Sequence, residues 1–162
     1  MTRTAHVSYG NAAFWVYDVA GSVFLWHLIQ AAEKHLEAHA APWLAETIAS
    51  WRIAAVITEV ASYTDDKWSR DQVDLVLELS RDATSSIRRH GNFSAAEVAS
   101  WPILEGHQIS TRGHDPIPAA AVARLGDAYA MLLEGTLPVA PERHTWFYTL
   151  DEVVHTIEMR ST

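Results

Sequence analysis

The stretch SRDQVDLVLELSRDATSSIRRHG, residues 69–91, predicts an amphipathic helix whose two ends can both be located. Ser69 with Gln72 three residues later forms a capping box, in which each side chain satisfies an otherwise unpaired backbone N–H. Gly91 follows the last turn, where glycine ends a helix because it enters the left-handed conformation without a Cβ clash. Helical spacing places one set of residues on the buried face: Val73, Val76, Leu77, Ser80, Ala83, Thr84 and Ile87.

The opposite face of this helix is acidic. It carries four acids at spacings of three, four and four: Asp71, Asp74, Glu78 and Asp82. Like charges at those spacings are neighbours that repel, so the stripe costs the helix some stability. Two interpretations stay open, a solvated face, which is what most charge runs are, and a docking face for a basic protein. In the second, Asp65 and Asp66 extend the acidic surface, and Trp68 supplies an aromatic anchor at the helix entry.

The remaining signals predict more helices and few strands. The expected helices run from Val19, with Asp18 as N-cap, to about His39; from Pro42 to near Tyr63; a short one after the Ser94–Glu97 capping box; from Pro118 to Gly135; and from the Thr149–Glu152 box to about Met159. Residues 1–11 are expected to be a tail or a short strand, and residues 14–17 an aromatic lead-in or short strand. We therefore expect a mainly all-α fold: a single domain over residues 1–162, a packed bundle of five or six helices, with one or two short strands allowed near 107–111 and 144–148.

The apolar run from Ala12 to Ala32 is long enough to raise the question of a membrane helix. Polar residues interrupt it, and no cluster of positive charge flanks it, so a central buried helix is the preferred interpretation. The first ten residues lack the features of a signal peptide, and the chain has no cysteine. These observations predict a cytoplasmic protein that does not enter the membrane.

The net charge of −8, from 20 acidic and 12 basic residues, restricts the class of partner. This field opposes phosphate binding, so a nucleic-acid binder is not expected, whereas a basic protein would be attracted. The seven tryptophans are expected mostly in the core, with one or two available to an interface. A homo-oligomer is also compatible with the sequence.

Each catalytic or metal-binding pattern lacks a required residue. His35 and His39 share a helix face, but Leu36 stands where the zinc-protease signature needs glutamate. Ser110 lies among histidines and an aspartate in the 102–117 segment, without the elbow that serine hydrolases use. No phosphate-binding loop is present. We therefore expect no catalytic residues, no metal and no cofactor, and a protein that is not an enzyme. The alternative is a small helical enzyme or ligand-binding protein with a site under the 102–117 loop.

In composition the chain resembles the small acidic immunity proteins of bacterial toxin–immunity systems, including contact-dependent inhibition. The stretch DDKWSRDQ, residues 65–72, which runs into the acidic helix, is similar in character to what such proteins present. The resemblance implies a stoichiometric inhibitor that neutralises a basic toxin domain, for example a nuclease, by covering or distorting its active site.

Overall fold

A four-stranded sheet and five helices make up the computed structural model, which describes residues 3–59 and 62–160. The elements in order are β1 (Thr4–Tyr9), β2 (Ala12–Tyr17), α1 (Asp18–Ala38), α2 (Pro42–Val56), α3 (Arg70–His90), α4 (Ala95–Ser100), α5 (Ala119–Glu134), β3 (His144–Tyr148) and β4 (His155–Glu158). The fold is therefore mixed α/β, and the prediction of a mainly all-α bundle is wrong.

The first correction concerns the pairing of the N-terminal segments: the described part of residues 1–11, like residues 14–17, takes the strand alternative of its expectation, and β1 and β2 form an antiparallel hairpin. Side chains alternate along it, with Val7 and Val16 buried and His6 exposed. Gly10 takes a φ of +59°, the left-handed value that the first position of a two-residue hairpin turn requires. Gly10–Asn11 between apolar runs is a hairpin signal that the expectation of a tail or a short strand did not use. Residues 1–2 of that expected tail lie outside the described residues.

The second correction concerns the C-terminal segment. β3 confirms the strand expected at 144–148, but the helix expected from Thr149 to Met159 is wrong, because residues 155–158 form β4 against β3. The predicted capping box is not made: the Thr149 hydroxyl accepts the N–H of Asp151 instead. Val153, Val154, Thr156 and Ile157 are β-branched, and such side chains fit a pleated sheet better than a helix.

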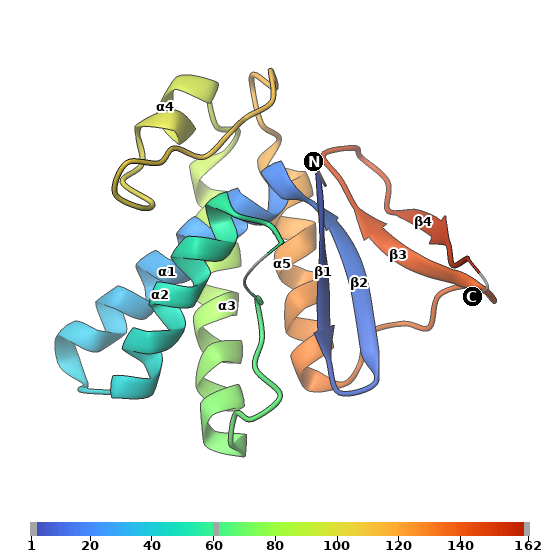
Figure 1. Cartoon of the computed structure of the whole chain (residues 1–162). Helices are drawn as coiled ribbons and strands as arrows, with labels where there is room; N and C mark the ends of the chain where they lie inside the picture. The colour runs from blue at the N-terminus through green and yellow to red at the C-terminus, as the bar shows by residue number, and fades with distance from the viewer. Residues whose placement is uncertain (1–2, 60–61, 161–162) are drawn as a thin grey trace.

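The sheet order is β1-β2-β3-β4, and β2 and β3 pair in parallel, so the first and last parts of the chain lie side by side. The sheet lies on one side of α5, and α1, α2 and α3 lie on the other (Figure 1). α1 packs against α2, α3 and α5, and one hydrophobic core runs through these helices and the inner faces of β1 and β2.

Details of the helices both confirm and correct the expectations. α3 carries the reciprocal Ser69–Gln72 capping box, which is confirmed, and is followed by Gly91. Asp18 is the first residue of α1 and not its N-cap, because its carboxylate is held by Arg112. α2 ends at Val56 rather than near Tyr63, and residues 60–61 of the expected helix lie outside the described residues. The backbone carbonyl of Tyr63 accepts hydrogen bonds from the Trp51 indole at 3.1 Å and the Tyr129 hydroxyl at 2.8 Å. Residues 107–111 form no strand; one isolated bridge joins Leu104 and His107.

Candidate functional site

The acidic face of α3 is exposed along its whole length: Asp71, Asp74, Glu78 and Asp82 all face solvent. Arg70 lies 3.5 Å from Asp74, an ion pair between two exposed side chains that contributes little. Within residues 3–59 and 62–160 no ion pair or side-chain hydrogen bond joins Asp71, Glu78 or Asp82 to the protein. Three of the four acids are therefore available to a partner.

Two arginines of α3 are paired away from the acidic face. Arg81 pairs with Glu134, and Arg88 pairs with Asp127 at 2.5 Å, both of them on α5. These pairs tie α3 to its neighbour, and the Asp127 carboxylate raises the pKa of the Arg88 guanidinium through their hydrogen bond. Two of the four arginines of α3 are thus engaged by α5, while Asp71, Glu78 and Asp82 stay unpaired within the described residues.

The turn before α3 holds the other predicted binding residues. Asp65 and Asp66 are exposed and stabilise the turn: Asp65 accepts the N–H of Lys67 at 2.8 Å, and Asp66 accepts that of Gly10 at 3.3 Å. Trp68 is only 9% exposed, so it is not the projecting anchor that we expected. A partner could reach Trp68 only by inserting a side chain beside it.

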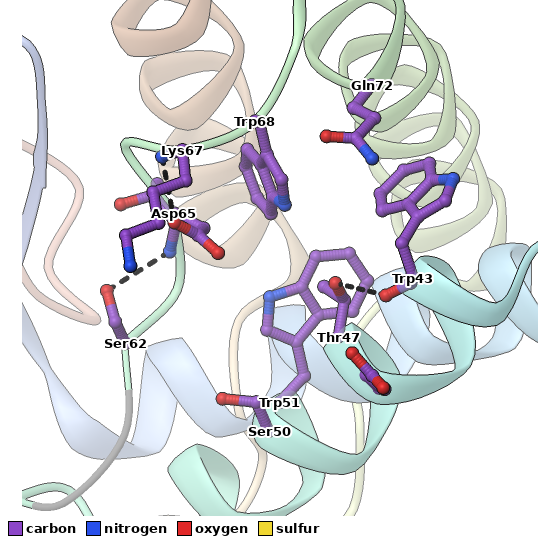
Figure 2. Close-up of a pocket in the computed structure, with 11 residues that line it drawn as sticks. Trp43, Thr47, Ser50, Trp51, Ser62, Asp65, Lys67, Trp68 and Gln72 are labelled. Carbon is purple, nitrogen blue, oxygen red and sulfur yellow. Dashed lines mark hydrogen bonds between the residues drawn. The ribbon is translucent and has the colours of Figure 1, made fainter.

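A pocket of about 410 Å³ makes that insertion feasible. We call it the tryptophan pocket, because Trp43 and Trp51 of α2 and Trp68 form its walls (Figure 2). The Trp51 indole N–H is used by the Tyr63 carbonyl. In contrast, the part of the chain that the structure describes provides no hydrogen-bond acceptor for the Trp68 indole N–H. The indole nitrogen of Trp68 keeps some exposed surface. An unused donor on a buried side chain therefore opens onto the pocket.

The chemistry of the tryptophan pocket suits a cation. Glu46 and Asp65 line it beside the indole rings, and Lys67 is a positive lining residue. Aromatic faces attract guanidinium and ammonium groups within about 6 Å of the ring centroid, and carboxylates add direct ion pairs. Because Gln72 of α3 also lines it, this pocket adjoins the start of the acidic face.

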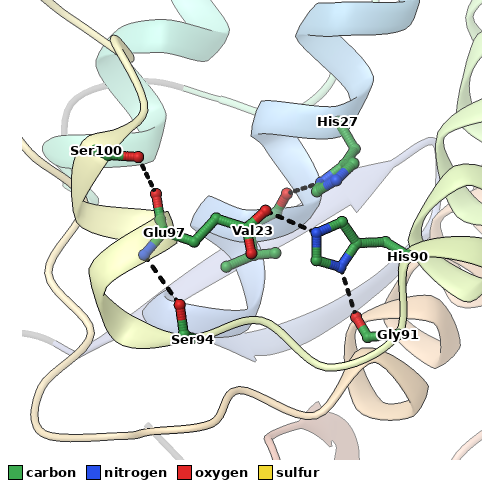
Figure 3. A network of polar contacts seen from close by, with 7 residues as sticks. All are labelled: Val23, His27, His90, Gly91, Ser94, Glu97 and Ser100. Atoms are coloured by element: carbon green, nitrogen blue, oxygen red, sulfur yellow. Dashed lines mark hydrogen bonds and ion pairs between the residues drawn. The ribbon is translucent and has the colours of Figure 1, made fainter.

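A second pocket, of about 680 Å³, lies between α1, α3 and α4. We call it the histidine pocket, because His27, His90 and Glu97 line it. His90 donates from Nδ1 to the Gly91 carbonyl at 2.9 Å and from Nε2 to Glu97 at 2.6 Å (Figure 3), an arrangement that requires the doubly protonated ring. The hydrogen bond to Gly91, with help from Glu97, raises the pKa of His90. Because Glu97 is used here, it does not complete the capping box expected with Ser94, whose hydroxyl still accepts the Glu97 N–H.

His27 in the same pocket has the opposite character. Its Nδ1–H donates to the Val23 carbonyl at 2.9 Å (Figure 3), so Nε2 is free to accept a hydrogen bond. Burial lowers the pKa of His27 and keeps the ring neutral. Two histidines with pKa values shifted in opposite directions therefore lie in one pocket.

The 102–117 loop contains no assembled triad. His107 bonds to the Glu105 carbonyl and His114 to the Tyr17 hydroxyl, and within residues 3–59 and 62–160 no hydrogen bond joins Ser110 to either histidine. A third pocket, of about 480 Å³, is lined by residues 99–102 and 104–108, and residues 102–117 line neither of the two pockets described above. The loop is instead fixed to the core by Arg112, which donates to the buried Asp18 carboxylate at 2.6 and 2.9 Å.

Neither a metal-binding cluster nor a membrane-spanning helix is present in the described residues. The rings of His35 and His39 stack 4.8 Å apart, but no group of three His, Asp or Glu side chains there could hold a metal ion. None of the helices described in residues 3–59 and 62–160 combines the length and apolar character needed to cross a bilayer.

Comparison with known proteins supplies no identity. The chain matches no protein-family model, no curated protein and no solved structure. The function has to be argued from the residues of the two pockets and the acidic face. Sequence reasoning missed both pockets, because their walls come from helices far apart in the chain, and it offered only the histidine and tryptophan counts as a signal.

Proposed function

We propose that this protein is a stoichiometric inhibitor of a basic protein domain, of the kind that immunity proteins provide against bacterial toxins. The acidic face of α3 would attract and orient the domain. A lysine or arginine of the domain would then enter the tryptophan pocket. No catalytic step is part of this function.

The observation that carries the proposal is the continuity of charge and pocket. Asp71, Glu78 and Asp82 are exposed and unpaired within the described residues, and Trp68, nine-tenths buried, lines the adjoining pocket together with Glu46 and Asp65. Exposed charges mainly accelerate encounter and set specificity, whereas a buried aromatic contact at the centre of an interface supplies most of the affinity. The two features together give one surface both functions.

The first test is to read the gene next to this chain, which we expect to encode a secreted protein with a basic C-terminal domain, and the second is a binding measurement with that domain. Asp74→Lys with Glu78→Lys should weaken the complex by at least about 10-fold at low salt, with a smaller loss at high salt. Glu142→Lys with Glu158→Lys is the matched control, because both acids are exposed on the β3–β4 side and change the net charge equally. Equal effects of the two double variants would show that only net charge matters, and the proposed docking face would be wrong.

A direct assay of inhibition separates binding from function. If the domain is toxic when expressed in bacteria, co-expression of the wild-type chain should restore growth, and the α3 double variant should restore it less. Restored growth with no complex between the purified proteins would contradict a stoichiometric inhibitor.

A further inference from the structure

The histidine pocket has a charge that contrasts with the rest of the molecule. Its lining includes three positive side chains, Lys34, Arg89 and the protonated His90, against two negative ones, Asp82 and Glu97. Glu97 is already bound by His90. A pocket with a positive balance on a chain of net charge −8 is suited to an anion.

Two of these cations are unpaired. Arg88 binds Asp127 on α5, but within residues 3–59 and 62–160 the next residue, Arg89, makes no ion pair or side-chain hydrogen bond, and neither does Lys34. Arg89 comes from α3 and Lys34 from α1, so the two charges reach the pocket from different helices. An anionic group between them could be held by both, since guanidinium and ammonium groups form charge-assisted hydrogen bonds to oxyanions.

An aromatic wall lies in the same pocket. The indole rings of Trp26 and Trp101 stack with a centroid distance of 5.3 Å and an angle of 7°. His27 meets Trp101 edge-on with a centroid distance of 5.5 Å, which helps to fix the plane of that ring. Trp26 is partly buried and lines the pocket together with Trp101, so this indole pair gives the pocket an aromatic wall.

The third feature is a neutral acceptor. Nε2 of His27 carries no proton while Nδ1 donates to Val23, and His27 lines the pocket beside the Trp101 ring. It can accept a hydrogen bond from a donor on a bound molecule. The pocket volume, about 680 Å³, lies in the range that small-molecule sites occupy.

We propose that the histidine pocket is a binding site for a small planar aromatic anion, whose ring stacks on Trp26 and whose anionic group lies between Lys34 and Arg89. The two pockets share no lining residue, and Asp82 is the one residue that the acidic face of α3 shares with this site. Gln30, Ser85 and Ser86 also line it and offer further polar contacts.

The experiment uses calorimetric titration of the full chain with 2-naphthoate as probe, compared with uncharged 2-naphthamide and with inorganic phosphate. Naphthoate should bind in saturable fashion at millimolar concentration, and each reference compound, lacking either the charge or the ring, should bind at least about 10-fold more weakly. Phosphate binding as tight as naphthoate binding would overturn the aromatic part of the proposal. No saturable naphthoate binding would overturn all of it.

Matched variants locate the site. Arg89→Gln should weaken naphthoate binding by about 10-fold or more and leave naphthamide binding unchanged, whereas Arg88→Gln, one residue away and paired with α5, should change neither. Trp26→Ala should weaken both ligands, with Trp15→Ala on β2 as the control for loss of an indole. Thermal unfolding confirms that each variant is folded. Equal loss from Arg88→Gln and Arg89→Gln in folded proteins would show that the probe binds outside this pocket.

Discussion

Replacement of Arg112 by alanine tests how the 102–117 loop is held on the core. Arg112 and Asp18 form a two-point ion pair, with Nε and Nη2 2.9 and 2.6 Å from the same carboxylate oxygen. The two side chains are 18% and 11% exposed, so the variant leaves Asp18 charged, nearly buried and without its partner. Alanine retains a Cβ, so the positive φ of 49° at this position is not relieved.

Loss of one partner of a buried ion pair typically costs 3–5 kcal/mol, and the residual exposure here places the expected loss near the lower end, at about 3 kcal/mol. For a chain of 162 residues this corresponds to a fall in the melting temperature of about 6–12 °C. Arg70→Ala removes an ion pair whose side chains are 90% and 59% exposed, and it should cost less than about 0.5 kcal/mol.

The assay is urea unfolding followed by circular dichroism, with Asp18→Asn and the Asp18→Asn/Arg112→Ala double variant completing the cycle. If the cost comes from an unpaired carboxylate, Arg112→Ala should cost much less in the Asp18→Asn background than in the wild type. A full loss of stability in both backgrounds would refute the reasoning, because the arginine would then act through its packing and not through the pair.

Three further predictions concern packing, pH and charge. Gly126→Ala should lower the free energy of unfolding in urea by about 1–3 kcal/mol, because the new Cβ would lie 2.1 Å from the Thr84 hydroxyl where α3 and α5 meet. The control is Ala120→Ser at an exposed position of α5, and an equally small effect of both substitutions would contradict this close approach. The pKa of His27 is lowered from 6.5 in the folded state, so its contribution to stability is complete above that pH and is lost as the pH falls. His27→Gln should therefore lose less unfolding free energy than wild type between about pH 7.5 and about pH 5.5, and an identical pH dependence would exclude His27 as a source of acid sensitivity. Lys67→Ala should tighten the complex with the basic domain severalfold by removing a positive charge from the tryptophan pocket, and weaker binding in a calorimetric titration would contradict a cation in that pocket.

Sequence reasoning succeeded where a structure is determined by neighbouring residues. The capping box at Ser69 and the glycine after α3 depend on local backbone geometry, and both are in place. The strand at 144–148 was also anticipated from its aromatic residues.

The errors have the opposite origin, in contacts between distant residues. Aspartate is a residue type that favours the N-cap position, but the carboxylate of Asp18 instead accepts hydrogen bonds from Arg112, which lies far along the chain. The Thr149–Glu152 pattern fits a helix, yet residues 155–158 find strand partners in β3. Trp68 could be recognised as aromatic but not as buried, because α2 supplies the walls around it. The acidic residues of the candidate site could therefore be predicted from the sequence, whereas the pockets beside them could not.

The parallel pairing of β2 with β3 has a consequence for how the chain folds and how it can be shortened. Trp15 and Val16 of β2 pair with Phe147 and Tyr148 of β3. The sheet therefore cannot be completed until the part of the chain that contains all five helices has been synthesised and has brought β3 next to β2. Contacts so distant in sequence slow folding. During that delay, or in a variant cut before His144, the inner edge of β2 presents unpaired backbone groups to any other strand. We expect such truncated chains to aggregate. In the full chain, β3 and β4 prevent this because β3 pairs with the edge of β2 that would otherwise be open.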